Sequence, residues 1–269
     1  MSHSNDRRLT GNRGSTPVKS GNLGSTPVKV PDALVAALCA AQHVCVLTGA
    51  GVSAESGVPT FRDAQSGLWS KYDPLDLATP EAFARDPALI WRWYRWRREL
   101  VAAAKPNPGH KALATLATRV PKLTLVTQNV DGLHQRAGSC DVIEFHGNLF
   151  ENRCSVENCV VAEDDGADIP TCPGCGGKLR PGVVWFGEAI PEQALHQSFA
   201  AAASCDLFLS IGTSSLVYPA AGLAEIARSA GATGVEINPN PTAHADGFDF
   251  VLQGNAAAVL PELIEYLPA

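Results

Sequence analysis

The sequence has little of what membrane, secreted or nucleic-acid-binding proteins need. No apolar run approaches the roughly 18 residues of a membrane-spanning helix. Acidic residues outnumber basic ones, 27 to 21, and the net charge of -6 argues against broad attraction to nucleic acid. The N-terminus lacks the apolar segment of a secretory signal, and its Gly and Pro residues would break the helix of a transit peptide. We therefore expect a cytoplasmic protein with neither membrane nor nucleic-acid partners.

Aromatic side chains are also scarce, at 7% of the 269 residues, and there is one methionine. Against this background, residues 91–100, WRWYRWRREL, contain three tryptophans, a tyrosine and four arginines. Such a segment could bind nucleic acid, a partner protein or an anionic ligand. The plainer interpretation is an amphipathic helix whose tryptophans pack and whose arginines are solvated. We favour that interpretation for Trp91, Trp93, Arg92, Arg95 and Arg98.

Residues 1–30 have the composition of a flexible tail. The segment 11–20, GNRGSTPVKS, recurs almost unchanged at 21–30 as GNLGSTPVKV, and it is too rich in Gly, Ser and Pro to build a packed core. We expect order to begin with a helix at Pro31 and Asp32.

Apolar strand patterns alternate with Ala- and Leu-rich helical patterns in the rest of the chain. Strand signals lie at 43–48, 122–134, 205–215 and 232–242, and helical stretches at 109–118, 192–203 and 219–230. This alternation predicts an α/β fold with a Rossmann-like parallel sheet and helices on both faces. We place this domain at 31–147 and 181–269, with a helical insertion at about 64–105 and a Cys-rich module at 148–180.

The first predicted strand runs into a glycine turn within TGAGVSAESGVPTFRD, residues 48–63. Gly49 and Gly51 would let the backbone approach a phosphate, and the following helix would offer free N–H groups. The spacing differs from GxGxxG, so on the glycines alone a plain tight turn is equally open. The polar continuation, with Ser53, Arg62 and Asp63, favours a nucleotide site.

Three further strand ends carry polar residues: Thr127–Asp131, Gly212–Ser215 and Glu236–Asn240. Each alone would be an ordinary loop of turn formers. Because the carboxyl ends of parallel strands line one crevice, the four segments together favour a bound dinucleotide. His146, between an apolar stretch and a Gly-Asn turn, could reach that crevice as a general base or could be structural.

Four of the eight cysteines form two close pairs, CSVENC with Cys154 and Cys159 and CPGC with Cys172 and Cys175. Two such pairs can close a tetrahedral thiolate site, which predicts a structural zinc ion because four sulfur ligands leave no open position. The alternative is a redox role for CPGC alone. Four other cysteines lie in apolar or turn settings typical of small core residues: Cys39, Cys45, Cys140 and Cys205.

Taken in chain order, these motifs resemble those of one enzyme family. GAGVSAESGVPTFRD, TQNVDGLHQRAG, EFHGN, the two cysteine pairs, PGVVWFGE, GTSSLVYPAA and EINPN are similar to the motifs of the sirtuins, the NAD-dependent protein lysine deacylases. The resemblance covers residues 31–269. It implies NAD as co-substrate, a structural zinc ion and acylated lysines of proteins as partners; a monomer is favoured.

The resemblance also implies roles for residues at matching positions. The implied NAD contacts are Gly49, Ala50, Gly51, Ser53, Phe61, Arg62, Gln128, Asn129, Asp131, Gly212, Thr213, Ser214, Asn238, Pro239, Asn240 and Ala256. His146 matches the catalytic base, acting with Asn129 and Asp131. The implied lining of one side of the substrate-peptide cleft is Val184, Phe186, Gly187 and Glu188.

The implied reaction breaks the glycosidic bond of NAD and releases nicotinamide, while the acyl oxygen of the modified lysine attacks the anomeric carbon. Asn129 and Asp131 would hold the carboxamide so that the ribose is presented correctly. His146 would deprotonate a ribose hydroxyl, which attacks the resulting imidate. The products would be free lysine, nicotinamide and O-acyl-ADP-ribose.

Within this resemblance the aromatic segment indicates an acyl preference. In the class III sirtuins, which prefer acidic acyl groups, a Tyr-x-x-Arg pair faces the acyl pocket and an upstream Ala widens it; Tyr94, Arg97 and Ala78 match. Residues three apart share a helix face, so Tyr94 and Arg97 can aim at one point. Arg97 could hold a carboxylate through a forked pair of hydrogen bonds, with Tyr94 donating another. We expect removal of succinyl and malonyl groups, and weaker removal of acetyl.

Two other functions stay open. Cleavage of NAD could serve to transfer ADP-ribose to a protein, or the chain could be an NAD- or ADP-ribose-binding module without turnover. The presence of His146, Asn129 and Asp131 argues against the module.

Overall fold

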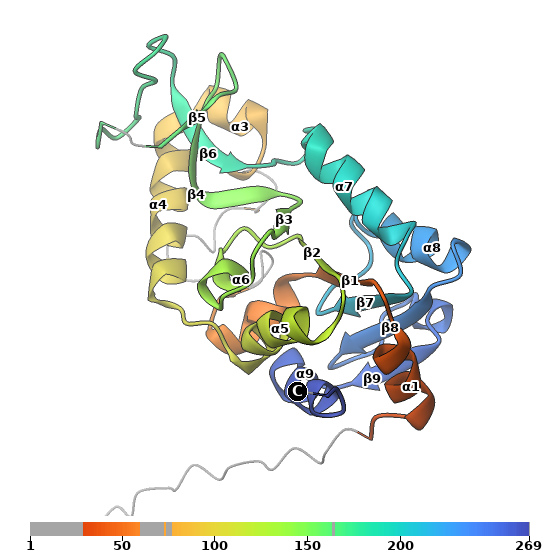
Figure 1. The fold of residues 1–269 in the computed structure, drawn as a ribbon. Coiled ribbons are helices and arrows are strands. Elements are labelled where there is room, and N and C mark those ends of the chain that lie inside the picture. Colours follow the sequence, from red (N-terminus) through yellow and green to blue (C-terminus); the bar gives the residue numbers. More distant parts are fainter. Residues whose placement is uncertain (1–28, 60–72, 74–76, 163–164, 269) are drawn as a thin grey trace, which may run out of the picture.

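A buried strand, β1 (Val44–Thr48), forms the middle of the main sheet in the computed structural model, which describes residues 29–59, 73, 77–162 and 165–268. It pairs in parallel with β2 (Leu123–Thr127) on one side and β7 (Leu207–Ile211) on the other. β3 (Ile143–Glu144) extends the sheet beyond β2, and β8 (Thr233–Asn238) and β9 (Phe250–Gln253) extend it beyond β7 (Figure 1). The order β3-β2-β1-β7-β8-β9 is that of a doubly wound nucleotide-binding sheet and confirms the predicted α/β class.

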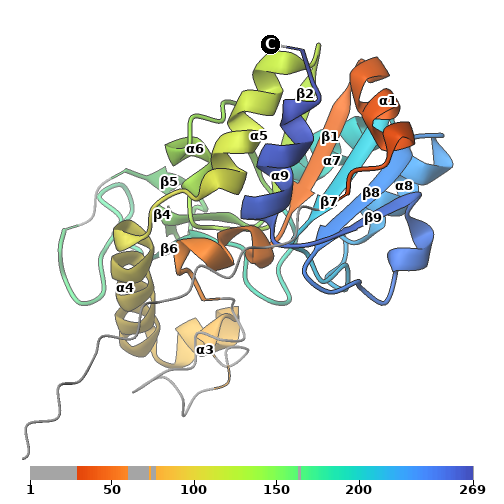
Figure 2. The same cartoon turned by 90° about the horizontal axis from the view of Figure 1, so that it is seen from below.

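Helices cover both faces of this sheet (Figure 2). One face carries α1 (Asp32–Ala40), α5 (Pro108–Arg119) and α9 (Ala256–Glu265), and the other carries α7 (Glu192–Ala202) and α8 (Gly222–Ser229). Because successive side chains of a strand alternate between faces, Val44 and Val46 pack into the first layer and Cys45 and Leu47 into the second. Burial on both faces explains why the strands read as continuous apolar runs.

The helix boundaries agree with most sequence expectations. α1 starts after Pro31 as predicted, and α5 and α7 lie where helices were expected. The helix expected from residue 219 begins at Gly222 instead, because 218–221 form turns. None of the helices in the described ranges is long and apolar enough to cross a membrane.

The expectation that the unpaired cysteines are core residues is half correct. Cys45 and Cys205 are buried, but Cys39 and Cys140 are exposed. Cys39 lies outside the stripe of α1 formed by the buried Leu34 and Leu38, and Cys140 lies in the loop before β3. Neighbouring sequence hydrophobicity does not determine which side of a helix faces the core.

A second, antiparallel sheet has the order β5-β4-β6, formed by β4 (Gly147–Cys154), β5 (Val160–Val161) and β6 (Leu179–Val183). Two helices, α3 (Pro80–Arg85) and α4 (Pro87–Ala103), pack with it around a separate apolar cluster. The Asp86 side chain caps α4 by accepting from Leu89 N–H. Gly147 of β4 pairs with Val183 of β6, so this sheet joins residues on both sides of the expected module, whose boundaries stay a prediction.

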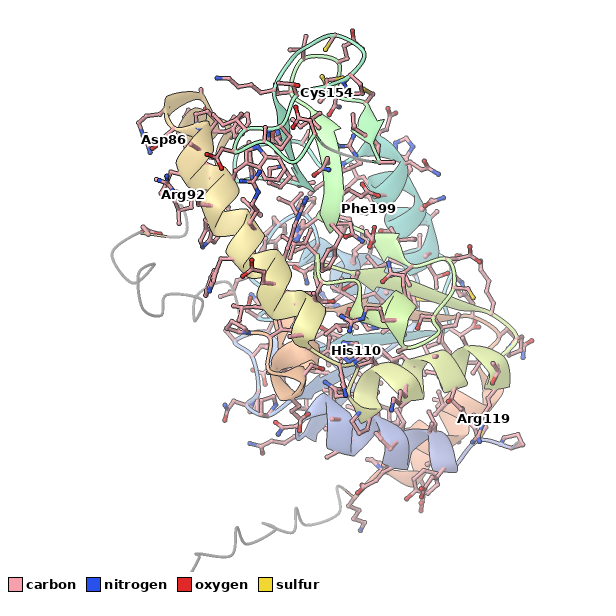
Figure 3. The ribbon with its side chains drawn as sticks, turned by 90° about the vertical axis from the view of Figure 1, so that its left-hand side faces the viewer. Asp86, Arg92, His110, Arg119, Cys154 and Phe199 are labelled. Atoms are coloured by element: carbon pink, nitrogen blue, oxygen red, sulfur yellow. The ribbon has the colours of Figure 1, made fainter. Side chains whose placement is uncertain are left out.

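The aromatic helix α4 runs beside the small sheet, with Arg92 on its outer side (Figure 3). Trp91 and Trp93 are buried and Arg92 is exposed, as predicted. The prediction that Arg98 is solvated is wrong, because its guanidinium donates to the carbonyl oxygens of Leu149 and Glu151 at 2.7 and 2.8 Å.

Arg95 likewise does more than face solvent. It donates to the carbonyl oxygen of Ala167 and forms an ion pair with Asp168. The arginines of α4 thus include groups that fasten the helix to the small sheet and its loop, which explains part of the unusual composition of this segment.

Candidate active site

The glycines after β1 bring two strand ends into direct contact. Gly49 N–H donates to the Ile211 carbonyl oxygen at 3.0 Å, and Gly51 N–H to that of Gly212 at 2.8 Å. A Cβ on Gly51 would lie 2.7 Å from the Gly212 Cα, so no larger residue fits without a shift. From the sequence, the missing side chains of Gly49 and Gly51 were expected to let a phosphate approach the backbone. In the structure they also allow the close contact between the strand ends of β1 and β7.

The segment that follows is η1 (Ala50–Ser56), so the helix expected after the glycine turn is a 3-10 helix. Ala50 is its first residue, and Ser53 is almost fully buried. Phe61, Arg62 and Asp63, and the tail residues 1–28, lie outside the described residues.

A hydrogen-bond network joins η1 to the loop after β2. Asn129 Nδ2 donates to the Gly49 carbonyl oxygen at 3.0 Å and to Ser53 Oγ at 3.2 Å. Ser53 Oγ donates to Asp131 Oδ2 at 2.7 Å, and the other carboxylate oxygen accepts from Leu133 N–H. Asn129, Asp131 and Ser53, assigned from distant motifs, therefore form one unit.

The other predicted strand ends join the same place. Gln128 Nε2 donates to Thr213 Oγ1 at 3.1 Å, linking β2 to β7, and Asn238 Nδ2 donates to the Thr213 carbonyl oxygen at 2.9 Å, linking β8. Ala256 is buried at the start of α9. Ser214, Pro239 and Asn240 are exposed at the rim. The expectation that these strand ends come together is confirmed, and their role as a dinucleotide site stays a prediction.

His146 follows β3 and lies beside the loop after β2. Its Nδ1 lies 3.0 Å from the Gln128 carbonyl oxygen. Since a carbonyl oxygen only accepts, Nδ1 carries the proton and Nε2 keeps a free lone pair. Burial lowers the pKa of His146, and the hydrogen bond to Gln128 opposes that shift. The neutral ring is therefore the prevalent form at neutral pH, as a general base requires.

Two buried histidines that the sequence analysis did not single out support the network. His110, at the start of α5 (Figure 3), places Nε2 3.3 Å from Ser53 Oγ. His134 Nε2 lies 3.0 Å from Thr48 Oγ1, and the two imidazole centroids are 4.8 Å apart. Burial and the neighbouring His110 lower the pKa of His134 to about 3. The capping pattern of Asn107 with His110 was the available signal for the first of these.

The predicted acyl-site residues come together between α4 and β6. The Tyr94 hydroxyl, almost fully buried, accepts from Trp185 Nε1 at 2.8 Å, and the Arg97 guanidinium carbon lies 5.8 Å from the Tyr94 ring centroid. Burial raises the pKa of Tyr94 to about 12 and lowers that of Arg97. Ala78 belongs to the same cluster, and its carbonyl oxygen accepts from Phe186 N–H at 2.9 Å.

The segment 184–188 connects this cluster to His146. Val184 N–H donates to the His146 carbonyl oxygen at 2.8 Å. The Glu188 carboxylate forms an ion pair with Arg180 and accepts from Trp185 N–H. Phe186 is 46% exposed, and Gly187 is exposed with a φ of 85°. The predicted cleft residues therefore lie between His146 and Tyr94.

Three of the four predicted metal ligands converge at the far end of the small sheet, where Figure 3 labels Cys154. The sulfur atoms of Cys154, Cys172 and Cys175 all lie within 4.8 Å of one another. Val156 and Glu157 donate backbone N–H groups to the Cys154 sulfur, which lowers its thiol pKa to about 7. Thiolate donors with this spacing fit tetrahedral zinc. Cys154 N–H donates to the carbonyl oxygen of Cys159, which places that residue on the adjoining turn.

Comparison with known proteins agrees with this geometry. The Sir2 family model matches residues 49–219. NAD-dependent protein deacylase 1 of Pseudomonas aeruginosa is 52% identical over 244 residues, which span 86% of this chain and 97% of that protein. The NAD-dependent protein deacylase of Methylococcus capsulatus is 50% identical over 246 residues, spanning 88% and 96%.

Solved structures lead to the same family. The crystal structure of a Sir2 homolog–NAD complex is similar with a TM-score of 0.83 and 42% identity, covering 90% of this chain and 95% of that one. A structure of Sir2 bound to acetylated peptide has a TM-score of 0.78 and 30% identity, covering 87% and 97%. With this family match over the glycine turn, the strand ends and the cysteine cluster, the chain belongs to the Sir2 family.

Proposed function

We propose that this chain is an NAD-dependent protein lysine deacylase that prefers acidic acyl groups, succinyl and malonyl, and removes acetyl more weakly. Its relatives carry the name NAD-dependent protein deacylase, and one similar structure holds NAD and another an acetylated peptide. The observation that supports the acidic preference is the meeting of Tyr94 and Arg97 beside the cleft segment 184–188.

The crevice at the strand ends fits NAD on its own geometry. A Cβ on Gly49, Gly51 or Gly212 would collide with the facing loop, so the loops after β1 and β7 are in close backbone contact. Asn129 donates to the Gly49 carbonyl oxygen and Asn238 to that of Thr213, which joins the loops after β2 and β8 to the same place. Such a meeting of strand ends is where a doubly wound sheet binds a dinucleotide. When bound, NAD supplies the ribose whose glycosidic bond is broken.

Different residues of the chain orient the nicotinamide, accept the proton and hold the substrate peptide. Ser53 and Asp131 hold the Asn129 loop against η1 and so orient the nicotinamide end. His146 accepts a ribose hydroxyl proton at Nε2, because Nδ1 is occupied by the Gln128 carbonyl oxygen. Residues 184–188 hold the substrate peptide so that the acyl-lysine enters between His146 and Tyr94.

Arg97 supplies the charge that distinguishes a succinyl from an acetyl group. Burial disfavours its protonated form, yet a guanidinium remains charged at neutral pH. A buried cation of this kind gains when a carboxylate arrives, because each charge offsets the desolvation of the other. An acetyl group offers no such partner.

The test compares succinyl-lysine and acetyl-lysine versions of one peptide in the presence of NAD. Arg97→Met should lower kcat/KM for the succinyl peptide by about 10- to 100-fold, the equivalent of one or two charged hydrogen bonds, and should leave the acetyl peptide nearly unchanged. Arg92→Met, on the exposed side of α4, is the matched control. An acetyl preference in the unmodified protein that Arg97→Met does not alter would contradict the proposal.

Mass spectrometry of the products separates the alternatives. O-acyl-ADP-ribose and free lysine indicate deacylation, whereas ADP-ribose attached to a protein would indicate transfer. NAD binding with no nicotinamide release from any acyl peptide would indicate a binding module.

We also propose that Cys159 supplies the fourth sulfur ligand of the zinc ion beside Cys154, Cys172 and Cys175. The Cys159 carbonyl oxygen accepts from Cys154 N–H at 2.9 Å, which brings Cys159 to the cysteine cluster. Desolvation and then the neighbouring Cys172 raise the pKa of the Cys159 thiol. A divalent ion would neutralise this crowding of thiolates.

A further inference from the structure

Trp185 lies directly behind the acyl site and is held there on several sides. It is 2% exposed, and its ring centroid lies 6.4 Å from that of Tyr94 and 5.4 Å from that of Phe83. The Arg180 guanidinium covers its face at 3.5 Å from the ring centroid. Arg180 is fixed in turn by its ion pair with Glu188 and by the Val183 carbonyl oxygen. The indole therefore has one orientation.

That orientation points the indole N–H at Tyr94, with a distance of 2.8 Å from Nε1 to the hydroxyl oxygen. An indole nitrogen only donates, so the Tyr94 oxygen is the acceptor of this hydrogen bond. The Arg97 guanidinium, also a donor only, lies 5.8 Å from the Tyr94 ring centroid and offers the phenolic proton no acceptor. The phenolic proton is therefore directed away from both groups and is available to an acceptor that enters beside them.

We propose that Trp185 is a positioning residue for acyl selectivity: by donating to the Tyr94 oxygen, it directs the Tyr94 O–H toward the terminal carboxylate of an acidic acyl group. The inference rests on the proposed function, in which Tyr94 and Arg97 bind that carboxylate. Hydrogen bonds in series strengthen one another, so the indole also makes the phenol a better donor. Without the indole N–H, the phenolic proton could turn away from the acyl group.

The same residue joins the acyl site to the peptide cleft. Trp185 N–H donates to the Glu188 carboxylate at 2.8 Å, and the adjacent Phe186 N–H donates to the Ala78 carbonyl oxygen. The backbone that flanks the substrate peptide and the side chain that orients Tyr94 thus belong to one short segment. A positioning role in selectivity therefore has to be separated experimentally from a role in holding the cleft.

The experiment replaces Trp185 by the tryptophan isostere in which sulfur takes the place of the indole N–H, so that the ring shape and its stacking under Arg180 are kept. A second variant, Trp185→Phe, removes the same N–H genetically. Each is assayed with succinyl-lysine and acetyl-lysine peptides and saturating NAD. We expect kcat/KM for the succinyl peptide to fall about tenfold, through a higher KM, and that for the acetyl peptide to change less than about twofold.

Trp91 is the matched control, because it lies on α4, is fully buried and donates its own Nε1–H to the Leu179 carbonyl oxygen at 2.9 Å, away from Tyr94. Trp91→Phe should leave the succinyl-to-acetyl ratio unchanged. In a Tyr94→Phe background the isostere should lower kcat/KM for the succinyl peptide by less than about a further twofold, since the hydroxyl that Trp185 orients is gone.

A succinyl-to-acetyl ratio of kcat/KM that stays within twofold of that of the unmodified protein would overturn the proposed role of Trp185. Equal losses of kcat/KM with both peptides would also overturn it, because that pattern indicates a structural role. An additive effect in the Tyr94→Phe background would overturn it as well. If the unmodified protein does not remove succinyl groups, the proposed acidic preference fails first, and that result appears before any variant is made.

Discussion

A methyl group at position 212 tests whether the contact between the β1 and β7 strand ends governs NAD binding. Gly212 has a φ of 60°, in the left-handed region. An added Cβ would lie 2.5 Å from Val52 N and 2.7 Å from the Gly51 carbonyl carbon. Both are backbone atoms of the first turn of η1, so they can give way only if that turn itself moves.

The expected cost of Gly212→Ala has two parts. A left-handed conformation costs an alanine about 1–2 kcal/mol. Overpacking against a fixed backbone costs about 1–3 kcal/mol. Gly231→Ala is the matched control, because Gly231 has a φ of 91° and a Cβ added there would meet nothing within 4 Å, so it carries only the conformational part. Gly212→Ala should therefore lower the free energy of unfolding by about 2–5 kcal/mol and Gly231→Ala by about 1–2 kcal/mol.

Urea unfolding measures the loss of unfolding free energy in both variants. The KM for NAD shows whether movement of the turn affects NAD binding. We expect Gly212→Ala to raise the KM for NAD about tenfold or more, since small displacements of a binding backbone are costly, and Gly231→Ala to leave it unchanged. Equal losses of stability in the two variants, together with an unchanged KM for NAD in Gly212→Ala, would refute this account of the glycine.

Three further predictions concern the base, the buried histidine and the metal. His146→Gln should lower kcat by about 100- to 10,000-fold without loss of stability. In the unmodified protein kcat/KM should fall as the pH drops through a value below 6.5, since burial lowers the pKa of His146 and only the neutral ring accepts a proton; an acid limb centred above 6.5 would contradict this. The free energy of unfolding should fall as the pH drops below 6.5, because the unfolded chain then protonates His134 whereas the folded chain keeps it neutral down to about 3. His134→Gln should flatten that slope in urea titrations at several pH values, and an unaltered slope would count against the assignment. Elemental analysis should find about one zinc ion per chain, lost together with thermal stability in Cys172→Ser but kept in Cys39→Ser; equal zinc in both variants would rule out the cysteine cluster as the site.

Much of the fold could be predicted because the relevant signals are local. The buried strands appear in the sequence as apolar runs, and the helices appear as Ala- and Leu-rich stretches. Because the strands are parallel, their carboxyl ends then lie at one edge of the sheet. The expected meeting of Tyr94 and Arg97 also follows from local geometry, since residues three apart on a helix share a face.

The errors and omissions have a common cause, which is that they depend on contacts across the chain. Arg98 was expected in solvent, yet the carbonyl oxygens of Leu149 and Glu151 lie within its reach. Cys39 was expected in the core, but the orientation of α1 turns it outward. His134 was not singled out, because its partners Thr48 and His110 are far away in sequence.

The sequence by itself determined the α/β class, the order of the motifs and the residue types available at each strand end, because these depend on periodicity and on chain direction. Only the tertiary structure decided which polar groups are paired and which nitrogen or proton is left for a substrate. The Gln128 carbonyl oxygen leaves Nε2 of His146 free, and the Trp185 indole determines where the Tyr94 proton can point. Hydrogen-bond direction depends on partners brought together by folding, and no local pattern of residues contains it.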